Sequence, residues 1–166
     1  MTVHDDHMYH GAALIQIAEH PSFTAINSLR TTAGVFHNAY RINQDIAAYM
    51  KYATKPTPAF EEYQFTFTKE HLEELEAITS VSLKLFVVLV CVEGRQICGL
   101  KYSQLLEIIG YRRKSKKEDE DQYVVLATLP KGKAFRVYVN ASGKKKTITG
   151  KQLIVARNSF PGLVFE

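Results

Sequence analysis

The sequence lacks the short motifs that identify many nucleotide-binding and hydrolytic enzymes. No phosphate-binding glycine loop, dinucleotide fingerprint, HExxH or GxSxG occurs in its 166 residues. It has only two cysteines, Cys91 and Cys98, which are too few for a disulfide framework and leave no second pair for a zinc site. Both lie in or beside apolar runs and neither has a basic motif nearby. We therefore expect buried, inert thiols on adjacent strands and a reducing, cytoplasmic location.

Long apolar segments are also missing. The longest run, LFVVLVCV at residues 85–92, is far shorter than the roughly 20 residues of a membrane-spanning helix. The N-terminal stretch has no basic region before its short, interrupted apolar part, so it does not resemble a signal peptide. We therefore expect no membrane partner.

Length and composition are typical of one globular domain over residues 1–166. Hydrophobic residues make up 46% of the chain and charged residues 23%, and a chain of this size can bury a core without disulfides or metals. Neither a repeat nor a linker interrupts it. Residues 112–122 begin with five basic residues among six and continue with four acids, which predicts an exposed, mobile charged loop.

The hydrophobic patterns predict an α/β fold, with a mixed, largely antiparallel sheet and flanking helices. Apolar residues at helical spacing and capping residues predict helices at 9–20, 69–78 and 101–110. The last of these should end at Gly110, and Thr68 should cap the second. Strands or hairpin arms are predicted at 22–29, 62–68, 85–92, 95–100 and 123–140.

Residues 39–54 fit two structures. One helical face would hold Ile46, Tyr49, Met50 and Ala53, whereas turn residues at 43–45 and the tyrosines favour a hairpin. The hairpin would place Lys51 on a strand near the centre of the sheet.

Charge is unevenly divided. Residues 1–100 hold 7 basic and 11 acidic side chains, and residues 101–166 hold 14 basic and 6 acidic ones. A basic half favours a polyanion, with DNA a better candidate than RNA, although lysine-rich loops also serve solubility. Tyr138 could stack on a base between such cations. The candidate phosphate-binding residues are Arg112, Arg113, Lys114, Lys116, Lys117, Lys133, Arg136, Lys144, Lys145 and Lys146.

The acidic half contains the elements of a metal-dependent phosphodiesterase. Glu19, Asp45 and Glu62 could supply hard oxygen ligands to Mg²⁺ or Mn²⁺ if the fold brings them together. Lys51 could then stabilise the charge that develops on the scissile phosphate. The same residues could equally be a helix end, a turn residue and a solvated strand end.

The order of helix, strands, lysine-bearing strand, aromatic strand and helix resembles the restriction-endonuclease-like, or PD-(D/E)XK, superfamily. Residues 39–56 followed by EYQFTF are similar to bacterial proteins assigned to it, and the resemblance covers roughly residues 9–110. It implies a helix that carries Glu19, an acid near Asp45 and a strand that carries Lys51.

The chain departs from that superfamily's motif at three points. Tyr49 stands two residues before Lys51, where the motif has Asp or Glu, and no Pro-Asp pair occurs. Glu62-Tyr63-Gln64 would be a variant with Gln64 in place of the catalytic lysine. The resemblance therefore implies either a divalent-metal endonuclease or an inactive, nucleic-acid-binding descendant. The alternative is a non-enzymatic protein-interaction domain that acts as a homodimer.

Overall fold

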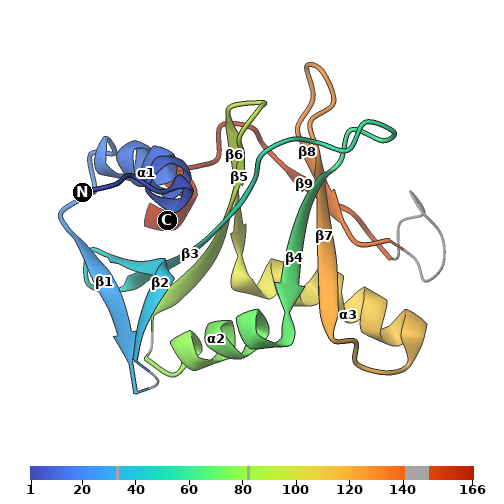
Figure 1. The fold of residues 1–166 in the computed structure, drawn as a ribbon, viewed down its shortest axis with the longest axis horizontal. Helices are drawn as coiled ribbons and strands as arrows, with labels where there is room; N and C mark the ends of the chain where they lie inside the picture. The colour runs from blue at the N-terminus through green and yellow to red at the C-terminus, as the bar shows by residue number, and fades with distance from the viewer. Residues whose placement is uncertain (33, 82, 141–149) are drawn as a thin grey trace.

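The strands and helices of this chain form two β-sheets with helices around them (Figure 1). The structure, a computed structural model, describes residues 1–32, 34–81, 83–140 and 150–166. In chain order the elements are α1 (Asp5–Ala18), β1 (Ile26–Thr31), β2 (Gly34–Ile42), β3 (Ile46–Ala53), β4 (Tyr63–Thr68), α2 (Lys69–Thr79), β5 (Lys84–Cys91), β6 (Gln96–Lys101), α3 (Tyr102–Lys116), β7 (Gln122–Thr128), β8 (Phe135–Tyr138), β9 (Leu153–Val155) and the 3₁₀-helix η1 (Gly162–Phe165).

The first sheet has the strand order β1-β2-β3-β5-β6, so β3 is its central strand. Strand β3 pairs in parallel with β5, and Lys51 lies opposite Leu89. The other strand pairs of this sheet are antiparallel. The α/β class, the 39–54 hairpin and the central place of the Lys51 strand, all predicted from the sequence, are confirmed.

The second sheet is an antiparallel meander in the order β4-β7-β8-β9. The sequence predicted a single mixed sheet, and here the prediction was wrong. A proline-bearing segment, residues 55–62, leads the chain away from β3 before β4 begins. The full length of β4 then pairs with β7 instead, from Tyr63 opposite Ala127 to Thr68 opposite Gln122.

The main core lies between the two sheets. Tyr49 and Val87 from the first sheet pack in one cluster with Phe65 and Val125 from the second, and α2 and α3 run along the bottom of both (Figure 1). The other face of the first sheet is covered by α1 and the C-terminal η1, where Ile17 and Val164 join the alternate β3 residues Ala48 and Met50. Strand β3 is thus buried on both faces, which explains its continuous apolar run at residues 46–50.

Helix α2 begins as the sequence predicted. The Thr68 hydroxyl accepts a hydrogen bond from the backbone N–H of His71, and Nδ1 of His71 accepts one from the backbone N–H of Thr68, both at 3.2 Å. This reciprocal pair satisfies two backbone donors that the first helical turn would otherwise leave without a partner.

Helix α3 is longer than predicted. It runs through Gly110 to Lys116 and ends at Lys117, which adopts a left-handed conformation with φ 60°. Residues 112–116 therefore belong to a helix and not to the loop predicted at 112–122. The five-residue link that follows, residues 117–121, is tied back to the helix by two ion pairs.

The two thiols lie where the sequence placed them. Cys91 and Cys98 are buried and free, on the adjacent strands β5 and β6. Burial raises the pKa of Cys91 to about 12, and that of Cys98 also rises. Among the helices of the described ranges, none is both long and apolar enough to span a bilayer.

Candidate functional site

Lys51 projects from the central strand into the space between β4 and α2. Its Nζ donates a hydrogen bond to the backbone oxygen of Thr66 at 2.6 Å and lies 3.2 Å from Nδ1 of His71. The same ammonium lies 5.1 Å from the centre of the Phe67 ring, within the range of a cation–π contact. The fold therefore holds this lysine in one defined, partly buried position.

The surroundings of Lys51 alter its protonation. Burial lowers the pKa of Lys51 to about 8, while the negative charge of Glu74 opposes the shift. Burial, followed by the positive charge of Lys51, lowers the pKa of His71. Because Nδ1 of His71 also accepts a hydrogen bond from the Thr68 backbone, the ring is held in its neutral form. A weakly basic amine beside a neutral imidazole could exchange protons near neutral pH.

Tyr49 occupies the position where the superfamily motif has a carboxylate. Its side chain is fully buried, and its hydroxyl donates a hydrogen bond to Oε1 of Glu74 at 3.2 Å. Burial raises the pKa of Tyr49, so this position offers a neutral phenol and no metal ligand. The carboxylate whose charge acts on the Lys51 ammonium, that of Glu74, comes from α2 and not from β3.

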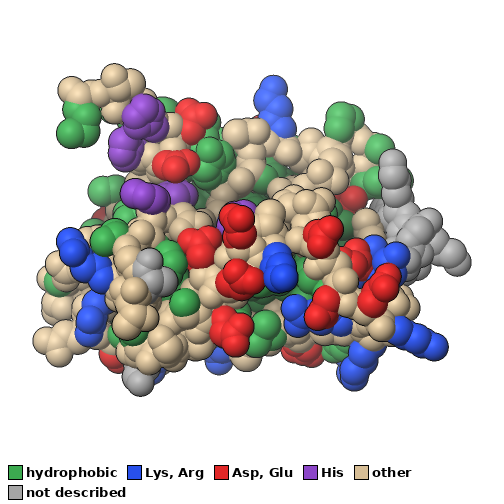
Figure 2. All heavy atoms as spheres, turned by 60° about the horizontal axis from the view of Figure 1, so that its bottom comes forward, with side chains coloured by type: hydrophobic (Ala, Val, Ile, Leu, Met, Phe, Trp, Pro, Cys, Tyr) green, Lys and Arg blue, Asp and Glu red, His purple; other side chains and the backbone are tan. Residues whose placement is uncertain are grey.

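The surface around Lys51 is acidic. Helix α2 carries Glu70, Glu73 and Glu76 on its exposed side, with Glu74 partly exposed beside them. Figure 2 shows acidic side chains gathered across the middle of the face that α2 and α3 form. A phosphate backbone approaching Lys51 from this face would meet like charge at close range.

The structure does not bring the three predicted metal ligands together. Glu19 is exposed at the C-terminal cap of α1, on the opposite face of the first sheet from the Lys51 side chain. Asp45 is exposed in the turn between β2 and β3, and Glu62 is buried before β4. Within the described ranges, no group of three His, Cys, Asp or Glu side chains could hold a metal ion. These residues therefore do not fit a Mg²⁺ or Mn²⁺ site.

The sequence offered two roles for Glu62, a metal ligand or a solvated strand end, and the structure shows neither. It is 3% exposed, and Oε2 accepts a hydrogen bond from the hydroxyl of Tyr138 on β8. Burial, together with this carboxylate, raises the pKa of Tyr138. Gln64, the third residue of the proposed motif variant, is exposed on β4, whereas Glu62 is buried.

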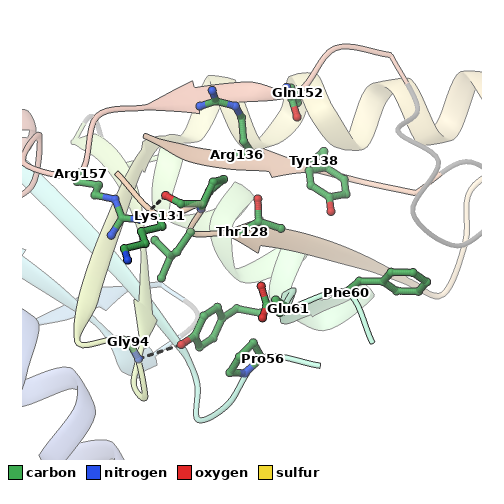
Figure 3. Close-up of a pocket in the computed structure, with 13 residues that line it drawn as sticks. Pro56, Phe60, Glu61, Gly94, Thr128, Lys131, Arg136, Tyr138, Gln152 and Arg157 are labelled. Carbon is green, nitrogen blue, oxygen red and sulfur yellow. Dashed lines mark hydrogen bonds between the residues drawn. The ribbon is translucent and has the colours of Figure 1, made fainter. Parts of the chain in front are cut away.

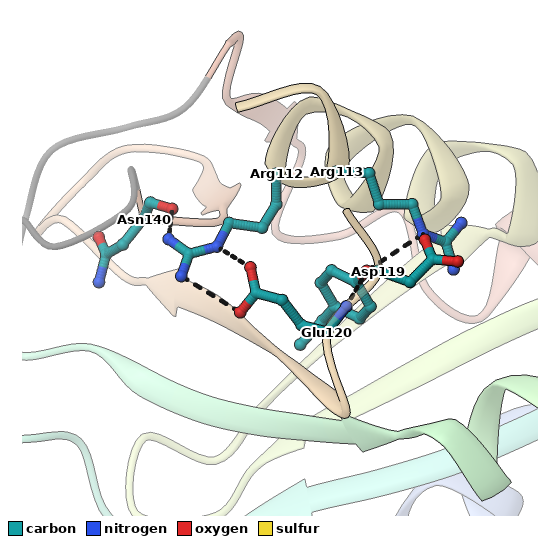
Figure 4. A network of polar contacts seen from close by, with 6 residues as sticks. Arg112, Arg113, Asp119, Glu120 and Asn140 are labelled. Atoms are coloured by element: carbon teal, nitrogen blue, oxygen red, sulfur yellow. Dashed lines mark hydrogen bonds and ion pairs between the residues drawn. The ribbon is translucent and has the colours of Figure 1, made fainter. Parts of the chain in front are cut away.

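Arg112 and Arg113, at the end of α3, form ion pairs with acidic residues of the link that follows the helix (Figure 4). Nε and Nη2 of Arg112 bind the two carboxylate oxygens of Glu120 at 2.7 and 3.3 Å, and Nη1 donates to the backbone oxygen of Asn140 at 2.8 Å. Nε of Arg113 lies 3.1 Å from Asp119. These contacts neutralise much of the positive charge that the sequence offered to phosphates here.

The remaining predicted cations within the described residues fall into two groups. Lys114 and Lys117 are exposed at the end of α3, and Lys116 is partly exposed there. Lys133 and Arg136 lie in the second sheet, on the β7–β8 turn and on β8. Lys144, Lys145 and Lys146 lie outside the described residues.

A cavity of about 740 Å³ is lined by segments of both sheets (Figure 3). The β7–β8 turn, one of these segments, lies at the end of the sheets that faces away from α2 and α3 (Figure 1). Its walls come from residues 56–63, from Gly94 in the β5–β6 turn, from the β7–β8 hairpin and from residues 152 and 157. Three cations line it: Lys131, Arg136 and Arg157. Tyr138, which we predicted could stack on a base, lines it too, whereas the predicted cation Lys133 is not among the lining residues.

Hydrogen bonds fix the walls of this cavity. Arg157 donates from Nε to the backbone oxygen of Lys133 at 2.6 Å and from Nη2 to that of Pro130 at 2.7 Å, which ties it to the β7–β8 turn. On the opposite wall, the Tyr63 hydroxyl accepts a hydrogen bond from the Gly94 N–H at 2.9 Å. The arginine is thus pre-oriented before any ligand arrives.

Glu61 is an acidic residue that lines this cavity, and its backbone conformation is unusual. Its φ of 54° lies in the left-handed region, which non-glycine residues rarely adopt and which often marks functional positions. Its N–H donates to the backbone oxygen of Thr57 at 2.8 Å, which holds the turn. Among the residues that line the cavity, the sequence pointed to Arg136 and Tyr138. It missed Lys131, Arg157, Phe60 and Glu61, because three separate segments supply them.

Comparison with protein-family models, with curated proteins and with solved structures gives no match.

Proposed function

We propose that this chain is a nucleic-acid-binding domain of restriction-endonuclease-like architecture that does not hydrolyse its ligand. The observation that carries the proposal is the cavity that Lys131, Arg136 and Arg157 line together with the aromatic residues Phe60 and Tyr63. Cations supply affinity for phosphates, and aromatic rings supply contact with bases.

The topology is consistent with the resemblance noted from the sequence. Helix α1 is followed by the meander β1-β2-β3, and a crossover through β4 and α2 leads to β5, which is parallel to β3. The lysine-bearing strand is central in the first sheet.

Loss of hydrolysis is supported by the environment of Lys51. The phenol of Tyr49 replaces the expected acid, and Glu19, Asp45 and Glu62 lie apart. The exposed glutamates of α2 also disfavour a phosphate at Lys51. Binding is therefore assigned to the cavity end of the molecule and not to the Lys51 end.

Fluorescence anisotropy with a labelled DNA oligonucleotide tests the proposal. We expect binding at low salt, and we expect the Lys131→Met/Arg136→Met double variant to weaken it at least tenfold, since two charge-assisted phosphate contacts are removed. Lys69→Met, which removes an exposed cation on α2, is the matched control and should bind like the wild type.

A nicking assay on plasmid with Mg²⁺ or Mn²⁺ tests the second part of the proposal. The wild type should leave the plasmid supercoiled, and cleavage that disappears in Lys51→Met would restore the nuclease hypothesis. Absence of oligonucleotide binding at low salt would instead contradict the first part and favour the protein-interaction alternative.

A further inference from the structure

We infer that the cavity between the β7–β8 hairpin and residues 56–63 binds a single unpaired nucleotide, with its phosphate at the cations and its base against the apolar wall. The inference rests on the proposed nucleic-acid binding and names the part of the polymer that the site takes. A free nucleotide and the unpaired end of a strand share this chemistry.

The size of the cavity fits one nucleotide. Its volume of about 740 Å³ lies within the range of roughly 300–1,000 Å³ that is typical of small-molecule sites. Inorganic phosphate alone would fill only a small part of it. A base stacked inside a duplex could not enter without leaving the stack, which has an energetic cost of a few kcal/mol.

Two of the three cations, Lys131 and Arg157, lie at one end of the cavity, and Arg136 lies above Thr128 (Figure 3). In the view of Figure 3, Lys131 and Arg157 lie at one side and Phe60 at the other, with Thr128 and Glu61 between them. Arginine presents its N–H groups as a planar fork that matches two oxygens of a phosphate. Two of the five N–H donors of Arg157 are used to fix its orientation on the β7–β8 turn.

The other end of the cavity suits a flat ring. Phe60 is partly exposed there, so a base could stack on its ring, while Pro56 lies between the two ends in the view of Figure 3. Tyr63 also lines the cavity, and its hydroxyl accepts a hydrogen bond from the Gly94 N–H.

The polar groups between the two ends fit the edge of a base or a ribose. Glu61 can accept hydrogen bonds from an exocyclic amine or a sugar hydroxyl, and the Thr128 hydroxyl can donate or accept. With three cations and one carboxylate on its walls, the cavity favours a ligand that is anionic at one end and carries N–H or O–H donors near its middle. A nucleotide has this division of charge.

Isothermal titration with the four nucleoside 5′-monophosphates, with adenosine and with inorganic phosphate tests the site. We expect at least one monophosphate to bind at least tenfold more tightly than phosphate, because stacking contributes about 1–3 kcal/mol per base. Arg136→Met and Lys131→Met should weaken monophosphate binding and leave adenosine binding nearly unchanged. Phe60→Ala should weaken both, and Lys69→Met should change neither.

Competition with oligonucleotides separates the two sources of the ligand. Displacement of the monophosphate by a single strand but not by a blunt duplex supports an unpaired end as the occupant, and failure of both oligonucleotides to displace it supports a free nucleotide. Monophosphate binding no tighter than phosphate, or unaffected by Arg136→Met and Phe60→Ala, would overturn the inference. Oligonucleotide binding without monophosphate binding would overturn it while leaving the proposed function intact.

Discussion

The buried carboxylate of Glu62 and the hydroxyl of Tyr138 are hydrogen-bonded to each other, although 76 positions separate them in the sequence. Glu62 lies just before β4 and Tyr138 ends β8, so the bond joins two strands that are not neighbours in the second sheet. The pair is beside the candidate nucleotide cavity, which Tyr138 lines. It therefore fixes one wall of that cavity.

Removal of the Tyr138 hydroxyl should destabilise the protein. Tyr138→Phe leaves the Glu62 carboxylate buried without this donor, at an expected cost of about 1–3 kcal/mol in the free energy of unfolding. Glu62→Gln should have a smaller effect because its amide oxygen can still accept the bond. Urea denaturation measures both variants, and equal stability of Tyr138→Phe and the wild type would show that the bond contributes nothing.

Lys51 should give the protein an alkaline pH dependence. The folded pKa is about 8 and the ordinary value is 10.5, so between these pH values the unfolded chain binds more protons. The contribution of Lys51 to stability therefore rises as pH increases from about 8 to above 10. At pH 7, we expect Lys51→Met to be more stable than the wild type by on the order of 1 kcal/mol, after allowance for solvent screening.

The wild type and Lys51→Met share the same thiols and tyrosines, which also titrate in the alkaline range. The difference between their free energies of unfolding therefore reports the titration of Lys51 alone. The advantage of Lys51→Met in the free energy of unfolding should shrink between pH 7 and pH 10. A constant difference across this range would mean that Lys51 is not desolvated in the folded state.

The start of α2 should depend on Thr68 and on a neutral His71. Thr68→Ala removes the cap and should reduce the free energy of unfolding by about 1 kcal/mol. His71→Gln preserves an acceptor at the third helical position and should keep the helix. Because the folded pKa of His71 lies below 6.5, the wild type should lose stability as pH falls below that value, and His71→Gln should lose less. Identical acid profiles for these two proteins, measured by thermal unfolding, would refute the role assigned to His71.

The two ion pairs at the end of α3 should contribute unequally. The Arg112–Glu120 pair is about one-fifth exposed and uses two hydrogen bonds, whereas the Asp119 side chain is 84% exposed. Glu120→Gln should therefore reduce the free energy of unfolding by about 1–2 kcal/mol, and Asp119→Asn by less than about 0.5 kcal/mol. Equal effects in chemical denaturation would contradict this ranking.

The elements that the sequence predicted well are those with local signals. Alternating apolar residues and turn residues identified the hairpins, and Thr68 identified the start of α2. Gly110 misled the prediction of α3, because a glycine inside a helix is tolerated where nothing else ends the helix and Lys117 supplies the left-handed terminus.

The division into two sheets and the cavity could not be read from local patterns. Strand β4 carries the same alternation whether it pairs with β3 or with β7, and only the tertiary fold decides between them. Glu62 looked like a solvated strand end because its partner, Tyr138, is distant in the chain. Arg157 lies far from the basic tracts that drew attention to Arg136, although both border one cavity.

The salt dependence of single-stranded oligonucleotide binding tests the central claim most directly. If Lys131, Arg136 and Arg157 bind the phosphate of the one nucleotide in the cavity, the slope of log K against log salt concentration should be about −0.7, since each neutralised phosphate of a single strand contributes roughly this amount. Arg136→Met should bring the slope closer to zero, and Lys69→Met should leave it unchanged. Binding that is independent of salt, or a slope that Arg136→Met does not alter, would contradict the assignment of nucleic-acid binding to this cavity.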